Sequence, residues 1–241
     1  MTSARNSSKQ LDDVLEALRE RADPSRLEGM VRYGIDTSHA LGVSMPEIRT
    51  VARSVERRHG LAQQLWVTEI HEARILASMV DEPERVTPSQ MDRWARDFES
   101  WDVCDQVCSN LFVRTPRAYA KAAQWSSRRA EFVKRAAFSL MASLAVHDKD
   151  ADDDAFVSFL PLIVAGSNDE RNFVKKSVNW ALRQIGKRDR RLNASAIATA
   201  EEIRALDSRA ARWIAADSLR ELRSDAVQAR LLSSGRTRTT R

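Results

Sequence analysis

The chain has 241 residues, which is enough to bury a sizeable core, and all-helical stacks of this length commonly form one continuous domain. The sequence is 43% hydrophobic and 30% charged and contains only seven glycines and six prolines. These are too few turn-forming residues for a protein made of strands and turns, so the composition predicts an all-α fold. Lysines and arginines outnumber acidic residues by 39 to 34, so the formal charge of +5 allows a polyanionic partner where the excess is clustered.

The two ends of the chain are polar, basic and without helical periodicity. The sequence begins MTSARNSSKQ and ends SSGRTRTTR. This composition predicts a flexible arm over residues 1–10, one folded domain over residues 11–230 and a flexible basic tail over residues 231–241. Neither a secretory signal nor an apolar run of about 18 residues occurs, which predicts a soluble protein of a reducing compartment without a membrane partner.

Between the arms, helical patterns alternate with short breaks, which predicts ten or more short helices. The breaks are expected at Asp23-Pro24, 42–46, Gly60, 83–88, Pro116, 148–154, Gly166 and Gly186. The acidic run over 148–154 lacks the glycine and distal glutamate of an EF-hand, so a solvated loop is favoured over a metal site.

The segment WDVCDQVCSNLF over residues 101–112 predicts a helix with an apolar stripe and a polar neighbouring face. Trp101 and Asp105 stand four apart on that second face, so an indole and a carboxylate project together. Alternatively, Asp105 pairs with a neighbouring arginine and Asp102 acts as a helix cap after Ser100. The stripe itself consists of Cys104, Val107, Cys108 and Leu111, which makes the cysteines small core residues.

The strongest internal signal is a repeat of about forty residues. The sequence FVKR at 132–135 returns 41 positions later as FVKK at 173–176, and a weaker third copy follows at 212–222. Such helical pairs cannot bury their apolar faces alone, so they stack side by side. The sequence therefore predicts a HEAT-like helical repeat solenoid, an α-α superhelix whose concave surface is lined by the second helix of each pair and can wrap a duplex.

Helical projection of these repeats separates an apolar stripe from a basic face. Arg135 and Lys176 occupy equivalent positions outside the stripe, and Trp180 and Arg183 share the face of Lys176. Stacked repeats would align them as a basic track on the concave surface, next to an aromatic ring. The alternative is an ordinary solvated face with Trp180 packed against a neighbouring helix. The predicted stripes are Val133, Ala136, Ala137, Leu140 and Leu144 in one repeat, and Val174, Val178, Ala181, Leu182 and Ile185 in the next.

Common catalytic and cofactor motifs do not occur. There is no G-x-S-x-G, Walker A, Rossmann or H-E-x-x-H pattern, and the four histidines are scattered without evident partners. These absences argue against hydrolase triads and zinc enzymes, and no metal or cofactor is expected.

Five segments together are typical of one known family. They are Tyr33 before ALGVSMPEIR (40–49), HEARILA (71–77), WDVCDQ (101–106), FVKRAA (132–137) and VNWALR (178–183). With them, the sequence resembles the AlkD-type DNA alkylation repair glycosylases, bacterial HEAT-like repeat proteins of nearly this length. Ser100 departs from the pattern, because some relatives carry a second tryptophan there.

The resemblance implies a DNA glycosylase that releases cationic N3- or N7-alkylated purines from duplex DNA in base excision repair. It implies that Trp101, Asp105, Arg135 and Trp180 gather around the damaged nucleotide, that Tyr33 is an N-terminal aromatic of the same site, and that the base need not be flipped into a pocket. Asp105, Trp101 and Trp180 are the catalytic candidates. Arg135, Tyr33, Lys176 and Arg183 are the DNA-binding candidates.

The expected partner is double-stranded DNA that contains alkylated bases, bound by a monomer without an obligate protein partner in the bacterial cytoplasm, at the nucleoid. Alkylation at N3 or N7 makes the base a cationic leaving group, so a carboxylate that stabilises the sugar as the bond breaks is the main requirement. The competing hypothesis is a non-catalytic HEAT-repeat scaffold or nucleic-acid binder in which Asp105 is structural.

Overall fold

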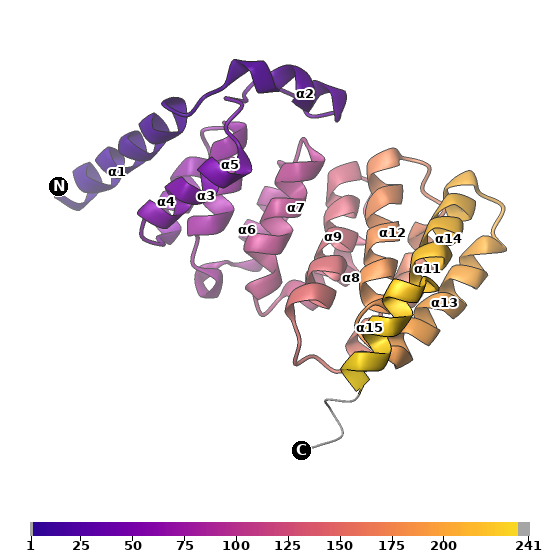
Figure 1. The fold of residues 1–241 in the computed structure, drawn as a ribbon. Helices are drawn as coiled ribbons and strands as arrows, with labels where there is room; N and C mark the ends of the chain where they lie inside the picture. The colour runs from indigo at the N-terminus through magenta and orange to yellow at the C-terminus, as the bar shows by residue number, and fades with distance from the viewer. Residues whose placement is uncertain (1, 236–241) are drawn as a thin grey trace. The chain divides into compact units, whose positions relative to one another are not determined.

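The computed structural model describes residues 2–235, which form fifteen α-helices and three short 3-10 helices with no strand among them. The all-α prediction is confirmed. Contacts cluster into two compact units, Met1–Pro116 and Arg117–Arg241, here called unit 1 and unit 2 (Figure 1). The single domain expected over residues 11–230 remains a prediction. None of the helices between residues 2 and 235 is long and apolar enough to span a bilayer.

Unit 1 contains seven α-helices, most of them short. They are α1 (Thr2–Arg19), α2 (Leu27–Arg32), α3 (Met45–Ser54), α4 (His59–Trp66), α5 (His71–Val80), α6 (Pro88–Arg96) and α7 (Trp101–Asn110), with 3-10 turns at Pro24–Arg26, Pro83–Arg85 and Phe112–Arg114. Helix α3 begins with a capping box in which Ser44 and Glu47 satisfy each other's backbone amides, followed by a proline in the first turn.

The core of unit 1 is aromatic. Trp66 of α4 stacks on Trp94 of α6 with ring centroids 4.0 Å apart and planes 2° apart, and the indole N–H of Trp66 donates to Asp97 at 2.9 Å. Phe98 and Phe112 contact the same rings edge-on or at a tilt. This cluster fixes α4, α6 and the approach to α7, because large rings contribute most of the buried apolar area in such a small unit.

Unit 2 contains longer and more regular helices. They are α8 (Ala118–Trp125), α9 (Glu131–His147), α10 (Asp153–Val157), α11 (Leu160–Gly166), α12 (Asn172–Gly186), α13 (Arg190–Arg204), α14 (Arg209–Leu222) and α15 (Asp225–Gly235). Helix α9 packs between α8 and α12, and α14 packs against both α12 and α13 (Figure 1). The predicted apolar stripes of α9 and α12 are buried throughout, which confirms them.

The repeat that the sequence predicts is visible as a physical contact. Phe132 at the start of α9 and Phe173 at the start of α12, 41 positions apart, lie with ring centroids 5.6 Å apart. Equivalent first turns therefore lie side by side in consecutive repeats, as expected for stacked helical pairs.

Three expectations about element boundaries differ from the structure. Residues 2–10, which were expected to form an arm, are the first part of helix α1. The later turns of α1 are anchored by the buried side chains of Val14, Leu15 and Leu18, and adding residues to an existing helix costs little free energy. Gly60 lies inside α4 instead of in a break. Helix α15 continues to Gly235, and the remainder of the expected tail, residues 236–241, lies outside the described residues.

Candidate active site

Helix α7 carries the two residues of unit 1 that the sequence places at the centre of the chemistry. Trp101 is its first residue and Asp105 lies one turn later, and both side chains are half-buried. On the other side of the helix, Cys104, Val107 and Cys108 are fully buried, and both cysteines are reduced. The expected separation of α7 into an apolar face and a face with an indole and a carboxylate is confirmed.

Tyr33 reaches the same end of α7. The indole N–H of Trp101 donates to the backbone carbonyl of Tyr33 at 3.0 Å, across 68 residues of sequence. The Tyr33 side chain at the end of α2 is 72% exposed. The structure therefore brings two of the predicted aromatic residues together and leaves the Tyr33 ring available to a ligand.

The loop that follows Tyr33 is held by one buried carboxylate. Glu72 of α5, 1% exposed, accepts the backbone N–H groups of Leu41 at 2.9 Å, Gly42 at 2.8 Å and Val43 at 3.2 Å. Gly42 has φ of +77°, and a Cβ at this position would lie 2.2 Å from the carbonyl oxygen of Asp23. Only glycine fits both the left-handed backbone and the close approach, which explains the LGV sequence before α3.

His71, next to Glu72, fixes the start of α7. Its backbone N–H donates to the carbonyl of His39 at 2.9 Å, and its Nε2 lies 2.9 Å from Oδ2 of Asp102. The other oxygen of Asp102 accepts the Ser100 hydroxyl at 2.7 Å and the Val103 amide at 2.9 Å. Asp102 therefore ties the first turn of α7 to α5, which adds to the helix-cap role that the sequence suggested for it.

The protonation of this pair follows from burial and partnership. Burial alone lowers the pKa of His71, but the hydrogen bond and negative charge of Asp102, together with the charge of Glu72, outweigh it and hold the pKa above its ordinary value. Burial alone raises the pKa of Asp102, yet its bonds to His71, Ser100 and the Val103 amide bring that pKa below its ordinary range. The two groups therefore favour the charged pair, with a proton on His71 and a carboxylate on Asp102.

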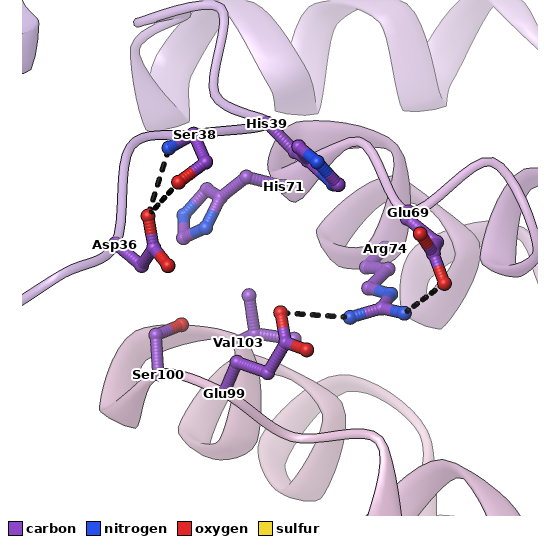
Figure 2. Close-up of a pocket in the computed structure, with 9 residues that line it drawn as sticks. All are labelled: Asp36, Ser38, His39, Glu69, His71, Arg74, Glu99, Ser100 and Val103. Atoms are coloured by element: carbon purple, nitrogen blue, oxygen red, sulfur yellow. Dashed lines mark hydrogen bonds and ion pairs between the residues drawn. The ribbon is translucent and has the colours of Figure 1, made fainter.

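A cavity of about 210 Å³ opens beside the first turn of α7 (Figure 2). The Arg74 guanidinium lies between the carboxylates of Glu69, 3.9 Å away, and Glu99, 3.7 Å away, and stacks 5.3 Å above the ring of Trp66. Glu69 has φ of 61°, a conformation that is costly for a residue with a side chain. The lining consists of Asp36, Ser38, His39, Glu69, His71, Arg74, Glu99, Ser100 and Val103, so acidic groups form most of its charged lining.

Arg135 of α9 departs from its expected exposure. Its side chain is only 5% exposed, and Nη1 donates to the carbonyl of Phe173 at 2.6 Å. The projection placed Arg135 outside the apolar stripe, but α9 is buried on nearly all sides, from Arg135 to Ala145. Periodicity alone missed this because α8 and α12 both cover the helix. Its equivalent Lys176 is exposed, so the two residues do not form the even basic track predicted from the repeat.

The remaining candidates lie on α12 of unit 2. Trp180 is half-buried and absent from the buried face of the helix, consistent with its projected position. Arg183, in contrast, forms ion pairs with Glu221 and, at 3.6 Å, with Asp217 of α14. Its charge is already balanced within the protein, which weakens the expectation that it binds DNA.

Two of the four histidines have carboxylate partners that the sequence did not reveal. His59 lies 2.8 Å from the buried Asp81, and His71 pairs with Asp102 as described above. Both partners are more than twenty residues away, so no local spacing could reveal them. The sequence HEAR was recognised as part of a family motif. That its side chains hold the loop before α3 and the start of α7 could not be recognised from the sequence.

Comparison with protein families decides the relationship. A model of a family described as "DNA alkylation repair enzyme" matches residues 14–229, nearly all of the folded chain. The chain belongs to this family. No curated protein gave a match.

Solved structures show the fold of this DNA alkylation repair family member. A protein described as belonging to "a new family of proteins related to the HEAT-like repeat DNA glycosylases with affinity for branched DNA structures" superposes with a TM-score of 0.73, at 17% identity over 92% of this chain and 95% of its own. A designed armadillo repeat protein gives a TM-score of 0.36 at 14% identity, over 74% of this chain and 94% of its own. The first match confirms the HEAT-like repeat fold.

Proposed function

We propose that this protein is a DNA glycosylase that hydrolyses the N-glycosidic bond of cationic N3- or N7-alkylated purines in duplex DNA. The observation that carries the proposal is the start of α7, where Trp101 and Asp105 lie one turn apart in a chain of the DNA alkylation repair family. An aromatic ring beside a carboxylate suits a reaction that develops positive charge on a sugar and begins from a positively charged base.

In this mechanism, Asp105 stabilises the deoxyribose as the glycosidic bond breaks. The bonding electron pair leaves with the alkylated base, which becomes neutral, and positive charge develops at C1′. Water then adds to C1′ and loses a proton to the Asp105 carboxylate or to solvent, as in glycoside hydrolysis. Trp101 and Trp180 contact the cationic nucleotide and exclude water from the reacting carbon.

The DNA-binding roles are proposed for residues of different exposure. Tyr33 and Lys176 are exposed and can meet the sugar-phosphate backbone directly. Arg135 is assigned a phosphate contact, although its buried guanidinium offers only a small surface for it. Arg183 contributes only if DNA displaces its bonds to Glu221 and Asp217. These residues are proposed to bind without reading sequence, since phosphate contacts position a duplex without specifying bases.

The test is base release from methylated duplex DNA, with products separated by chromatography and identified by mass. We expect 7-methylguanine or 3-methyladenine in the supernatant, while neutral unmodified bases and O6-methylguanine stay in the DNA. The alternative function is non-catalytic DNA binding, because the structural relative is described by its affinity for branched DNA structures. Binding to the duplex without release of any methylated base would establish that alternative.

Phosphate recognition is tested separately by the salt dependence of duplex binding. Arg135→Ala is expected to weaken binding and to reduce the slope of log affinity against log salt by about one phosphate contact. Because Arg135 also bonds the Phe173 carbonyl, the melting temperature of the variant must be measured alongside. An unchanged salt slope in a folded variant would exclude the phosphate role.

A further inference from the structure

The exposed face of α14 combines four arginines with a tryptophan. Spacings of three and four residues place them on one side of the helix, opposite a buried side that is apolar except for Ser218. The members of this face, here called the α14 stripe, are Arg209, Arg212, Trp213, Ala216, Arg220 and Arg223, and every one is exposed. From Arg209 to Arg220 the stripe extends about 17 Å along the helix axis, enough to follow several phosphates of one strand.

Trp213 is the unusual member of this stripe. Its side chain is 40% exposed, whereas Trp66, Trp94 and Trp125 are almost completely buried. The Nζ of Lys175, on α12, lies 5.0 Å from the centre of the indole, which leaves the ring oriented by a cation but still open to solvent. A large aromatic side chain kept at the surface among cations indicates a binding function, because burial would otherwise be more favourable.

The charges of the stripe are available to an anion. Arg209 is 87% exposed and lies 4.0 Å from Glu170, and Arg220 is 78% exposed beside Asp217. Arg212 lies 3.2 Å from Asp207. The pairs of Arg209 and Arg212 are exposed on both sides and contribute little in water, so a phosphate can replace the carboxylate at small cost. Asp217 is less exposed, but the Arg220 guanidinium itself is open to a phosphate. Arginine guanidinium groups also match phosphate oxygens in geometry.

We propose that the α14 stripe binds a single DNA strand, with Arg209, Arg212 and Arg220 on its phosphates and an unpaired base stacked on Trp213. Bases inside a duplex are already stacked and offer no face to an indole, whereas every unpaired base does. Cations that follow a backbone, with an aromatic ring between them, are the usual means of binding single strands without sequence preference. This site uses none of the residues proposed as catalytic, but it adjoins the proposed duplex contacts, because Asp217 pairs with both Arg183 and Arg220.

The test is the affinity of the full-length protein for an oligothymidine of about twenty nucleotides, measured by fluorescence anisotropy beside a duplex of equal length. Trp213→Ala should weaken single-strand binding about tenfold, since stacking on one base is worth roughly that much, while Trp213→Phe retains most of it. The Arg209→Gln, Arg220→Gln double variant should reduce the salt slope by about 1.4, at about 0.7 per phosphate on a single strand.

Arg190→Gln is the matched control, because Arg190 at the start of α13 is exposed yet lies outside the stripe. Its affinity and salt slope should equal those of wild type. Unchanged single-strand affinity in Trp213→Ala would overturn the proposal, as would an equal loss of duplex and single-strand binding. Base release from methylated duplex is measured on the same proteins. If wild type releases nothing while the stripe variants still lose single-strand binding, the glycosylase proposal fails and this one stands.

Discussion

Unit 1 buries two carboxyl groups and an arginine between its helices, whereas unit 2 joins its helices mainly through apolar faces and small hydroxyls, with Lys121 and Arg135 as its buried basic residues. Glu72, Arg74 and Asp81 are all more than nine-tenths buried in unit 1. The buried serines of unit 2, such as Ser177 and Ser218, bond carbonyls of their own helices. The difference follows from the backbone, because the loop after α2 has amides that only a side chain can satisfy, while regular helices satisfy their own.

This contrast has a consequence for the proposed chemistry. The residues that hold Trp101 and Tyr33 in unit 1 are charged, so their arrangement depends on pH and on single hydrogen-bonding atoms. Helix α12, which carries Trp180 in unit 2, is held mainly by its buried apolar face, with the partly exposed ion pairs of Arg183 beside it, so its arrangement depends mainly on volume. Substitutions chosen by charge and by volume should therefore act differently on the two units.

The largest effect is expected for loss of volume in unit 2. Phe138 of α9 is fully buried, and its ring is within 2.4 Å of where a Cβ on Gly166 would lie. Phe138→Ala should lower the free energy of unfolding by about 4 kcal/mol, through lost burial and the cavity left behind. Urea denaturation measures this, with Val146→Ala on the exposed side of the same helix as control. Similar losses in the two variants would contradict tight packing around α9.

A somewhat smaller effect is expected for loss of charge in unit 1. Glu72→Gln should cost about 3 kcal/mol, because an amide offers one acceptor oxygen where a carboxylate offers two, and backbone N–H groups lose their partner. Denaturation gives the magnitude, and limited proteolysis should show earlier cleavage within residues 33–44. The exposed Glu56→Gln serves as control. A Glu72→Gln protein as stable as that control would show that the loop is held by other contacts.

The pH dependence of unit 1 should be carried in part by His71. Because its pKa is raised in the folded protein, the stabilising pair with Asp102 is complete below the ordinary histidine pKa and is lost as pH rises through the folded value. Asp102, whose pKa is lowered, keeps the pair intact well into acid. Wild type should therefore lose stability relative to His71→Gln as pH rises above the ordinary histidine pKa of about 6.5. The exposed His39→Gln should follow wild type. Parallel pH profiles of wild type and His71→Gln would refute the ionised pair.

The smallest effect is expected at the ion pair between α12 and α14. Arg183 and Glu221 are each 28% exposed, so water screens them, and Arg183→Gln should cost only about 0.5 kcal/mol at low salt and less at high salt. Thermal denaturation at two ionic strengths measures this. A cost that does not change with salt would mean that Arg183 stabilises by packing and not by charge.

The sequence predicted those parts of the fold that depend on periodicity. The stripes of α9 and α12 follow from helical spacing, and the contact of Phe132 with Phe173 follows from the repeat. The burial of Arg135 could not be predicted, because it depends on how many neighbours cover a helix. The single-stranded site proposed at Trp213 was also missed, since the third repeat was recognised only by its alternation of small, apolar and basic residues.

The candidate site was predicted in part. The position of Trp101 and Asp105 on one side of α7 follows from their spacing. The bonds of Trp101 to Tyr33 and of Asp102 to His71 each join positions more than thirty residues apart, so they exist only in the folded chain. The catalytic roles remain a prediction of the family relationship and of the chemistry.

The most direct test of the central claim is the single-turnover rate of 7-methylguanine release, with protein in excess over methylated duplex. Asp105→Asn should release the base at least about a hundredfold more slowly, as expected for loss of a group that stabilises charge in the transition state, while its duplex affinity is unchanged. Asp12→Asn, an exposed change on α1, should react like wild type. Equal rates for Asp105→Asn and wild type would contradict the proposed mechanism.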